Sequence, residues 1–377
     1  AFLPNSPAVA LSPGSARVIL QTPNKVSLTE ARNARRAESS SARRMTSDVP
    51  EASTPSTSAK ERERINNALS KIYSLAGILS AFSWIATAYV ALSFHPDPKF
   101  ADCTLRHNVL TMSQAFAFPL PVAWAAFEAL RRCAGNRATL NSSTGRRLNL
   151  GVAAASLWLA ASAMFPPAFA FGYDLYSRRH KLASSVIHGA TGTVALLLAL
   201  RSTSSLGRIV REILDSLWNS GPKSNDRNGS AYATGAAGLL YFSIQPVVSP
   251  YPLATIPTIL GKRLSRPASA FTLLGAVLAY CLKESSADGV DDGEEGAARA
   301  TLRKGLAWGT TGHLCLILAK IIGLDGGGLI LPGRGLWEVY PAMIAVPFAA
   351  GVSFVVHAIL CFGAWTEEGA DDNALRP

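Results

Sequence analysis

Apolar residues between Leu75 and Trp365 are gathered into separate runs, and polar and charged residues fill the segments between them. Each run is about as long as the roughly 20 residues that a helix needs to cross a bilayer. Hydrocarbon offers no water to backbone N–H and C=O groups, so only regular hydrogen-bonded structure crosses it. The pattern therefore predicts an all-α, polytopic integral membrane helix bundle of about eight transmembrane helices, within a range of seven to nine.

The expected spans are residues 73–94, 109–130, 148–171, 182–200, 232–260, 268–282, 306–322 and 340–362. A capping box at Ser58-Ala59-Lys60-Glu61 predicts the start of the first helix. Pro119 and Pro121 are expected to bend the second span near its middle. The fifth contains four prolines, so it either ends near Val248 and continues as an interfacial segment, or re-enters the membrane.

Changes in composition divide the chain into five parts. Residues 1–57 are a transit-peptide-like disordered leader, 58–201 the first four-span half, and 202–230 an amphipathic interfacial helix with a polar linker. Residues 231–365 form the second four-span half, and 366–377 an acidic disordered tail. Ala76-Gly77-Ile78-Leu79 and Ala237-Gly238-Leu239-Leu240 open corresponding spans, so the halves are either a 4+4 duplication or alike by chance.

The net charge of +11 is carried by the loops, because charged residues make up only 16% of the chain and avoid the apolar runs. With eight spans, the loops on the N-terminal side hold most of the lysines and arginines. This bias predicts that both mature termini lie on the basic, inner face. It favours a lipid bilayer and other membrane proteins as partners, and no nucleic acid, since no basic patch interleaved with aromatic residues occurs.

The leader is rich in serine and arginine and poor in acidic residues, as organelle transit segments are. Its start, Ala1-Phe2-Leu3-Pro4, resembles the presequence junction of diatoms and related algae with secondary plastids, where a signal peptide is cut just before a phenylalanine. The resemblance implies a plastid membrane, either thylakoid or envelope. The alternatives are a mitochondrial leader and a disordered tail.

Polar side chains inside spans are functional candidates, because burying them in hydrocarbon costs free energy. Glu128 and Lys320 lie near span ends and are interpreted as structural. The ligand candidates are the remaining five, His188, His313, His357, Gln114 and Gln245. If the fourth, seventh and eighth spans adjoin, the three imidazoles converge and can ligate haem or chlorophyll or relay protons. Otherwise each is hydrogen-bonded separately across a helix interface.

No arrangement of catalytic residues, no metal-ligand spacing among the five cysteines and no phosphate-binding loop occurs in the sequence. We therefore predict no catalytic residue and no metal site, and no cofactor unless a histidine holds haem or chlorophyll. The sequence favours a small-solute transporter or permease. The alternative is a non-catalytic pigment- or haem-binding or scaffold subunit of a photosynthetic complex, and a lipid-modifying enzyme ranks last for want of clustered ionisable groups.

Overall fold

The computed structural model describes residues 59–93, 105–164, 178–201, 207, 227–248, 259–288, 293–321 and 351–366. These residues form helices joined by short turns, with no strand among them, and the predicted all-α class is confirmed. All lie in one contact unit, Ser58–Pro377. The leader, the acidic tail beyond residue 366 and, except for Gly207, the amphipathic helix lie outside the described residues.

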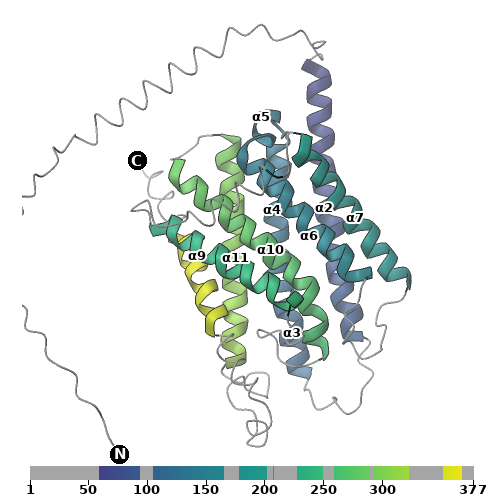
Figure 1. The fold of residues 1–377 in the computed structure, drawn as a ribbon, viewed down its shortest axis with the longest axis vertical. Helices are drawn as coiled ribbons and strands as arrows, with labels where there is room; N and C mark the ends of the chain where they lie inside the picture. Colours follow the sequence, from purple (N-terminus) through teal and green to yellow (C-terminus); the bar gives the residue numbers. More distant parts are fainter. Residues whose placement is uncertain are drawn as a thin grey trace, which may run out of the picture. The chain divides into compact units, whose positions relative to one another are not determined.

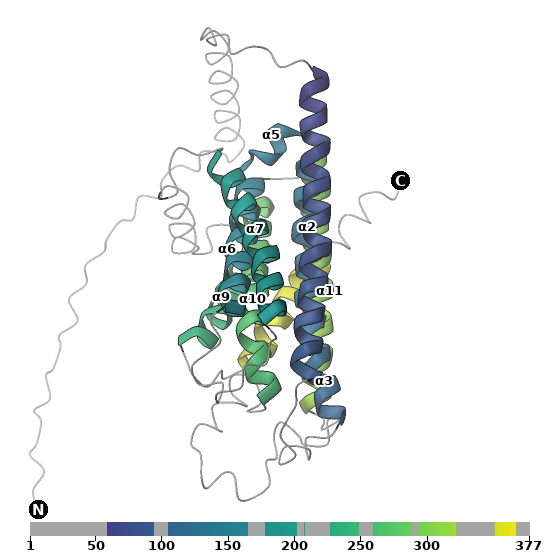
Figure 2. The ribbon, with the colours of Figure 1, turned by 90° about the vertical axis from the view of Figure 1, so that its right-hand side faces the viewer.

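Every predicted span overlaps a helix (Figures 1 and 2). The helices are α2 (Ala59–Ser93), α3 (Leu105–Ala117), α4 (Pro119–Cys133), α5 (Arg137–Leu140), α6 (Ser143–Met164), α7 (Arg178–Arg201), α9 (Arg227–Val248), α10 (Ile259–Asp288), α11 (Glu294–Ile321) and a last one, Gly351–Thr366, called the terminal helix below. The first begins directly after Ser58, where the capping box placed it. The fifth span is helical as far as Val248, and residues 249–258 are not described.

In place of the expected bend, the helix is interrupted at one residue: α3 ends at Ala117, α4 begins at Pro119, and Phe118 between them keeps a right-handed helical backbone. Proline has no N–H, so Pro119 and Pro121 leave the carbonyls four residues earlier, at Ala115 and Ala117, without their helical donors. The indole Nε1–H of Trp84 in α2 donates to the Ala115 oxygen at 2.8 Å. Trp84 is therefore a buried hydrogen-bond donor, only 1% exposed.

A second tryptophan donates to α10, which contains Pro267. The Nε1–H of Trp158 in α6 donates to the Arg266 carbonyl at 3.1 Å and to the Ser269 hydroxyl at 3.0 Å. Unlike the Ala115 carbonyl, the Arg266 carbonyl is not the one that the proline deprives of its helical donor, which is four residues before Pro267. Each indole joins two helices that are distant in the sequence.

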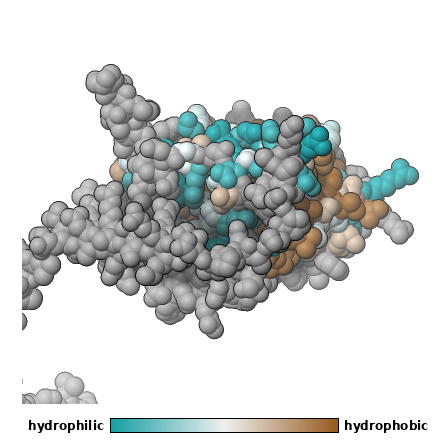
Figure 3. Space-filling model, turned by 90° about the horizontal axis from the view of Figure 1, so that it is seen from above, coloured by the Kyte–Doolittle hydropathy of each residue, from teal (hydrophilic) through white to brown (hydrophobic). Residues whose placement is uncertain are grey.

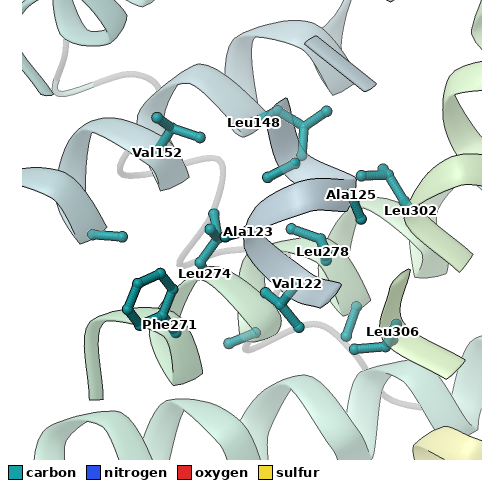
Figure 4. Packing of buried hydrophobic residues seen from close by; sticks show 14 of the residues in the cluster. Val122, Ala123, Ala125, Leu148, Val152, Phe271, Leu274, Leu278, Leu302 and Leu306 are labelled. Atoms are coloured by element: carbon teal, nitrogen blue, oxygen red, sulfur yellow. The ribbon is translucent and has the colours of Figure 1, made fainter. Parts of the chain in front are cut away.

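The core is built around α4, which packs against α2, α6, α10 and α11. Its small side chains let the other helices approach closely. A Cβ atom added at Gly305 of α11 would lie 2.1 Å from the Cβ of Ala125, so only glycine fits there. Figure 4 shows side chains of four helices pointing toward one another here, among them Val122, Leu148, Val152, Phe271, Leu274, Leu278, Leu302 and Leu306.

The bundle has an apolar core, and it also exposes large apolar side chains. Large apolar side chains are exposed, many of them on α2 and α7, whereas many hydroxyl, amide and imidazole groups are buried. In Figure 3 hydrophobic residues gather on the side where α2 and α7 lie in Figure 1. Among the described helices, Glu63–Val90 and Arg179–Arg201 are long and apolar enough to cross a membrane. The exposed set on these two includes Leu75, Ile78, Phe82, Tyr89, Leu182, Val186 and Leu197.

Side-chain contacts bring several helix ends together at one end of the bundle. Asn66 of α2 donates to the Gly135 carbonyl, which follows α4, at 3.1 Å. The guanidinium of Arg147, at the start of α6, lies 5.0 Å from the ring centre of Tyr280, near the end of α10. This end carries the basic residues Arg131, Arg132, Arg146, Arg147, Lys283, Arg299, Arg303 and Lys304.

Glu128, one turn before the end of α4, pairs with two of these basic residues. Its carboxylate lies 2.6 Å from Arg131 Nε and 3.0 Å from Arg132 Nε. The hydrogen bond to Glu128 raises the pKa of Arg131. The acid is thus held by neighbouring arginines at the helix end, a structural role.

Substituting phenylalanine for Trp84 tests how much the indole hydrogen bond to the Ala115 carbonyl stabilises the protein. Trp84→Phe keeps an aromatic ring against Phe271, whose ring centre lies 5.0 Å away, but leaves the Ala115 carbonyl without the indole donor. We expect the free energy of unfolding to fall by about 1–3 kcal/mol, the cost of an unsatisfied buried acceptor. Thermal unfolding of the detergent-solubilised protein, followed by circular dichroism, measures the change. Trp124→Phe, at a side chain that is 55% exposed, is the matched control and should unfold like the wild type.

Candidate functional site

Two of the three predicted histidines meet inside the bundle. His313 lies on α11 and His357 on the terminal helix, and their ring centres are 4.4 Å apart with the planes tilted by 31°. Phe118, at the break between α3 and α4, presents an aromatic edge contact to each ring, at 6.1 Å from His313 and 5.2 Å from His357. We call these three residues the histidine pair site.

Glycines on two helices make room for Phe118. A Cβ atom at Gly275 of α10 would lie 2.7 Å from the tip of the Phe118 ring. At Gly309 of α11 it would lie 3.3 Å from both the ring and the carbonyl oxygen of Phe118. The ring is therefore enclosed by close helix contacts, the packing that small residues allow. Its position follows from the helix break, which separates Phe118 from both regular helices.

One ring nitrogen of His357 forms a hydrogen bond within its own helix. The Nδ1–H donates to the carbonyl oxygen of Ser353, one turn earlier, at 2.7 Å. In the neutral ring, this tautomer leaves Nε2 with a lone pair that can accept a proton or a hydrogen bond. His357 is 4% exposed, so whatever Nε2 contacts lies within the bundle.

Three contacts fix the register of the terminal helix on α11. The Thr311 hydroxyl lies 3.2 Å from the Cys361 sulfur and accepts a hydrogen bond from the Trp365 indole at 3.1 Å. The rings of Trp308 and Trp365 meet edge to face with centres 5.8 Å apart. These contacts lie next to the histidine pair and hold the two helices that carry it.

His188 lies apart from this pair, and the glutamines lie on other helices. His188 is buried on α7, whose main partners are α6 and α2. Gln114 is half-buried on α3, one turn before Phe118, and Gln245 is buried on α9. The expected convergence of three imidazoles is therefore reduced to two. The side chain of Lys320 lies outside the described ones.

The geometry limits what the two imidazoles can hold. They are in direct ring contact, whereas the two axial ligands of a haem lie on opposite faces of its macrocycle, so the pair as it stands cannot sandwich one. Within the described part of the chain, no group of three or more His, Cys, Asp or Glu side chains is placed to bind a metal ion. The rings stack with their planes tilted by 31°, and a nitrogen that points away from the stack can form a hydrogen bond with a polar group.

Sequence reasoning missed Phe118, whereas the helical spacing already placed Ser353 on the same face as His357. Phe118 could have been singled out because it directly precedes Pro119, and a proline at that position interrupts a regular helix. Ser353 lies four residues before His357, the spacing of neighbours on one helix face. The aromatic contact itself leaves no signal in the sequence.

Comparison with protein-family models, with curated proteins and with solved structures finds no match to the chain.

Replacing Phe118 by alanine tests whether the ring supports the site. Phe118→Ala removes a buried ring, and we expect a loss of about 3–5 kcal/mol in the free energy of unfolding, the usual cost of Phe→Ala in a core. Phe362→Ala is the control, since that ring is 71% exposed on the terminal helix. Thermal unfolding in detergent compares the two. Equal effects would contradict the central position of Phe118.

Proposed function

We propose that the chain is a multi-pass membrane protein that moves a small solute across a plastid membrane, thylakoid or envelope, with the histidine pair site in its path. The proposal is carried by one observation: two imidazoles meet at a helix break inside a bundle whose outer face is apolar. Transporters commonly bind substrate where discontinuous helices open the regular backbone.

The exposed apolar side chains support the placement in a membrane. Exposing side chains such as Phe82, Val186 and Phe362 to water costs free energy, whereas contact with lipid hydrocarbon does not. The two helices that qualify by length and composition, α2 and α7, are also in contact with each other. The basic end of the bundle is the end expected on the inner face.

The contacts between halves support a 4+4 duplication. In such a repeat α4 of the first half corresponds to α10 of the second, and α6 to α11. The structure contains both equivalent pairs, since α6 packs against α10 and α11 against α3 and α4.

Glycines at corresponding positions occur in both pairs. Gly151 of α6 lies against Val277, and Gly312 of α11 against Ala117. Gly151 and Gly312 are as far apart in sequence as Gly77 and Gly238. Repeats of this kind are a common architecture of transporters.

The break supplies polar groups as well as space. Pro121 leaves the Ala117 carbonyl without its helical donor, and this oxygen would lie 3.6 Å from a Cβ atom at Gly312, next to His313. A backbone carbonyl and two imidazoles thus come from three segments of the chain. Such a set can hold a small hydroxylated or carboxylic solute through hydrogen bonds.

Uptake into vesicles tests the transport proposal. The protein, in its full-length form, is reconstituted into liposomes and offered a panel of radiolabelled sugars, amino acids and small carboxylates. We expect flux of at least one solute above that of empty liposomes. His357→Phe, which keeps a ring but removes both nitrogens, should lower the initial rate tenfold or more.

Thr234→Val is the matched control, because this hydroxyl is exposed on α9 and bonds only to its own helix in the contacts described. Its rate should equal that of the wild type. An alkaline carbonate wash of source membranes is run in parallel and should leave the protein in the pellet. Membrane-retained protein with no flux across the panel would contradict transport, and protein in the supernatant would contradict the membrane placement.

A pigment- or haem-binding subunit is the second candidate, and the tautomer of His357 favours it. An imidazole that donates Nδ1–H to a backbone carbonyl presents Nε2 as a metal ligand, as histidines at metal sites usually do. Only one of the stacked rings would serve as an axial ligand to haem iron or chlorophyll magnesium. This function would require Phe118 or His313 to move aside.

An absorption spectrum decides between the two candidates. Protein purified in mild detergent from its native membrane should be colourless under the transport proposal. A Soret or chlorophyll band that copurifies in stoichiometric amount, and is lost in His357→Phe but kept in Thr234→Val, would instead establish the second function.

A further inference from the structure

The central helix α4 is open to the outside along one narrow stripe. From Val122 to Cys133 every residue is buried except four, which are Trp124, Glu128, Arg131 and Arg132. Their spacing of four, three and one residues places them on one face of the helix. Trp124 is 55% exposed, and the two arginines lie at the basic end of the bundle. We call these four residues the α4 stripe.

A single carboxylate orients both arginines of the α4 stripe. Glu128 accepts hydrogen bonds from Nε and one terminal nitrogen of Arg131 at 2.6 Å and 2.7 Å, and from Nε of Arg132 at 3.0 Å. One negative charge therefore meets two positive charges, which leaves an excess of +1. The remaining terminal N–H groups of the two guanidiniums form no hydrogen bond within the part of the chain that the structure describes. Each arginine side chain is 41% exposed, so these donors are accessible from outside.

The outward N–H groups match an anion with several oxygens. Arginines in the last turn of a helix are favoured by the helix dipole, which explains why basic residues stand at this place. The dipole does not use the terminal N–H groups, whereas their fork-shaped arrangement fits the oxygens of a phosphate. On α11, which packs against α4, Glu295 pairs with Arg299 of its own helix at 3.2 Å. The excess charge of the α4 stripe thus needs a counterion from outside the chain.

We propose that the α4 stripe binds the headgroup of an anionic phospholipid, whose phosphate accepts hydrogen bonds from Arg131 and Arg132. The single net negative charge of a headgroup such as phosphatidylglycerol balances the excess positive charge. A zwitterionic headgroup brings its own cation and leaves that charge unbalanced. The inference rests on the membrane placement proposed above, but it does not depend on the histidine pair site.

Trp124 extends the α4 stripe from the headgroup toward the hydrocarbon. It precedes Arg131 by seven residues, a distance of about 10 Å along the helix axis. Its Nε1–H has no partner within the described residues, and an ester carbonyl of the same lipid is an acceptor of the kind that indoles meet at membrane interfaces. Gly77 of α2 packs against α4 at this level, so the exposed Leu75 and Ile78 offer an apolar surface to the acyl chains.

Native mass spectrometry with defined lipids tests the site. The full-length protein, delipidated in detergent, is mixed with phosphatidylglycerol or with phosphatidylcholine of the same acyl chains. We expect the first phosphatidylglycerol to bind about tenfold more tightly than the first phosphatidylcholine, because two arginines contribute. Arg132→Gln should weaken phosphatidylglycerol binding about fivefold, the usual contribution of one arginine at an anionic surface, and leave phosphatidylcholine binding unchanged.

Arg64→Gln is the matched control, because it removes the same charge from an exposed arginine at the same end of the bundle but on α2. It should bind phosphatidylglycerol like the wild type. Equal weakening in the two variants would show a general effect of net charge and would overturn the proposal. Equal affinity of the wild type for the two lipids, or displacement of the lipid by inorganic phosphate at the same concentration, would overturn it as well.

Quenching by brominated lipid tests where the headgroup site lies. Phosphatidylglycerol with brominated acyl chains, as a minor component of phosphatidylcholine micelles, should quench the tryptophan fluorescence more than brominated phosphatidylcholine does. Most of this excess should be lost in Trp124→Phe, which changes no charge. An excess that persists in Trp124→Phe would place the lipid elsewhere and contradict the proposal. Failure of the membrane placement itself would be seen separately, as protein in the supernatant of the alkaline carbonate wash.

Discussion

The arrangement of this bundle depends on how one carbonyl group is satisfied. Pro119 cannot donate to the Ala115 oxygen, and a carbonyl buried without a donor is costly in protein or lipid. The Trp84 indole supplies the donor from α2 and so ties α2 to the end of α3. With that bond in place, the helix can be interrupted at Phe118 without leaving the Ala115 carbonyl unsatisfied. The position of the Phe118 ring, and with it the environment of both imidazoles, follows from this interaction.

Small residues then bring the other helices up to the break. Gly275 and Gly309 allow α10 and α11 to close on Phe118, while Gly305 allows α11 to lie on α4. The terminal helix is held to α11 by Thr311 and its partners, which aligns His357 with His313. Close van der Waals contact at these glycines and a few hydrogen bonds therefore determine which helix faces meet.

The sequence predicted the helices well because hydropathy reports on each segment separately. The apolar runs located eight helical segments, and Pro119 marked the place where one is interrupted. What the runs could not predict was which helices adjoin. Hydropathy shows that a histidine lies within a span but not which helix it faces. His188 and His313 were therefore equally good candidates for a contact with His357, and the structure gives that contact to His313.

The roles of the tryptophans were equally inaccessible from the sequence. Trp84 and Trp158 both lie within predicted spans, and each donates to a carbonyl oxygen of another helix. Their role depends on a three-dimensional coincidence between an indole and a carbonyl far along the chain. The amphipathic helix predicted around Ile209 and the plastid leader lie outside the described residues and stay predictions.

The two equivalent helix pairs, α6 with α10 and α11 with α4, are unequal in chemistry. At the sequence offset that relates Gly151 to Gly312, the counterpart of His313 is Val152 and that of Phe118 is Ala279, both buried and apolar. Trp158 also bonds α6 to α10 through two oxygens. In a conformational cycle, the first pair would act as the hinge and the second as the gate, so any motion there would differ between the two pairs, whether or not the halves arose by duplication.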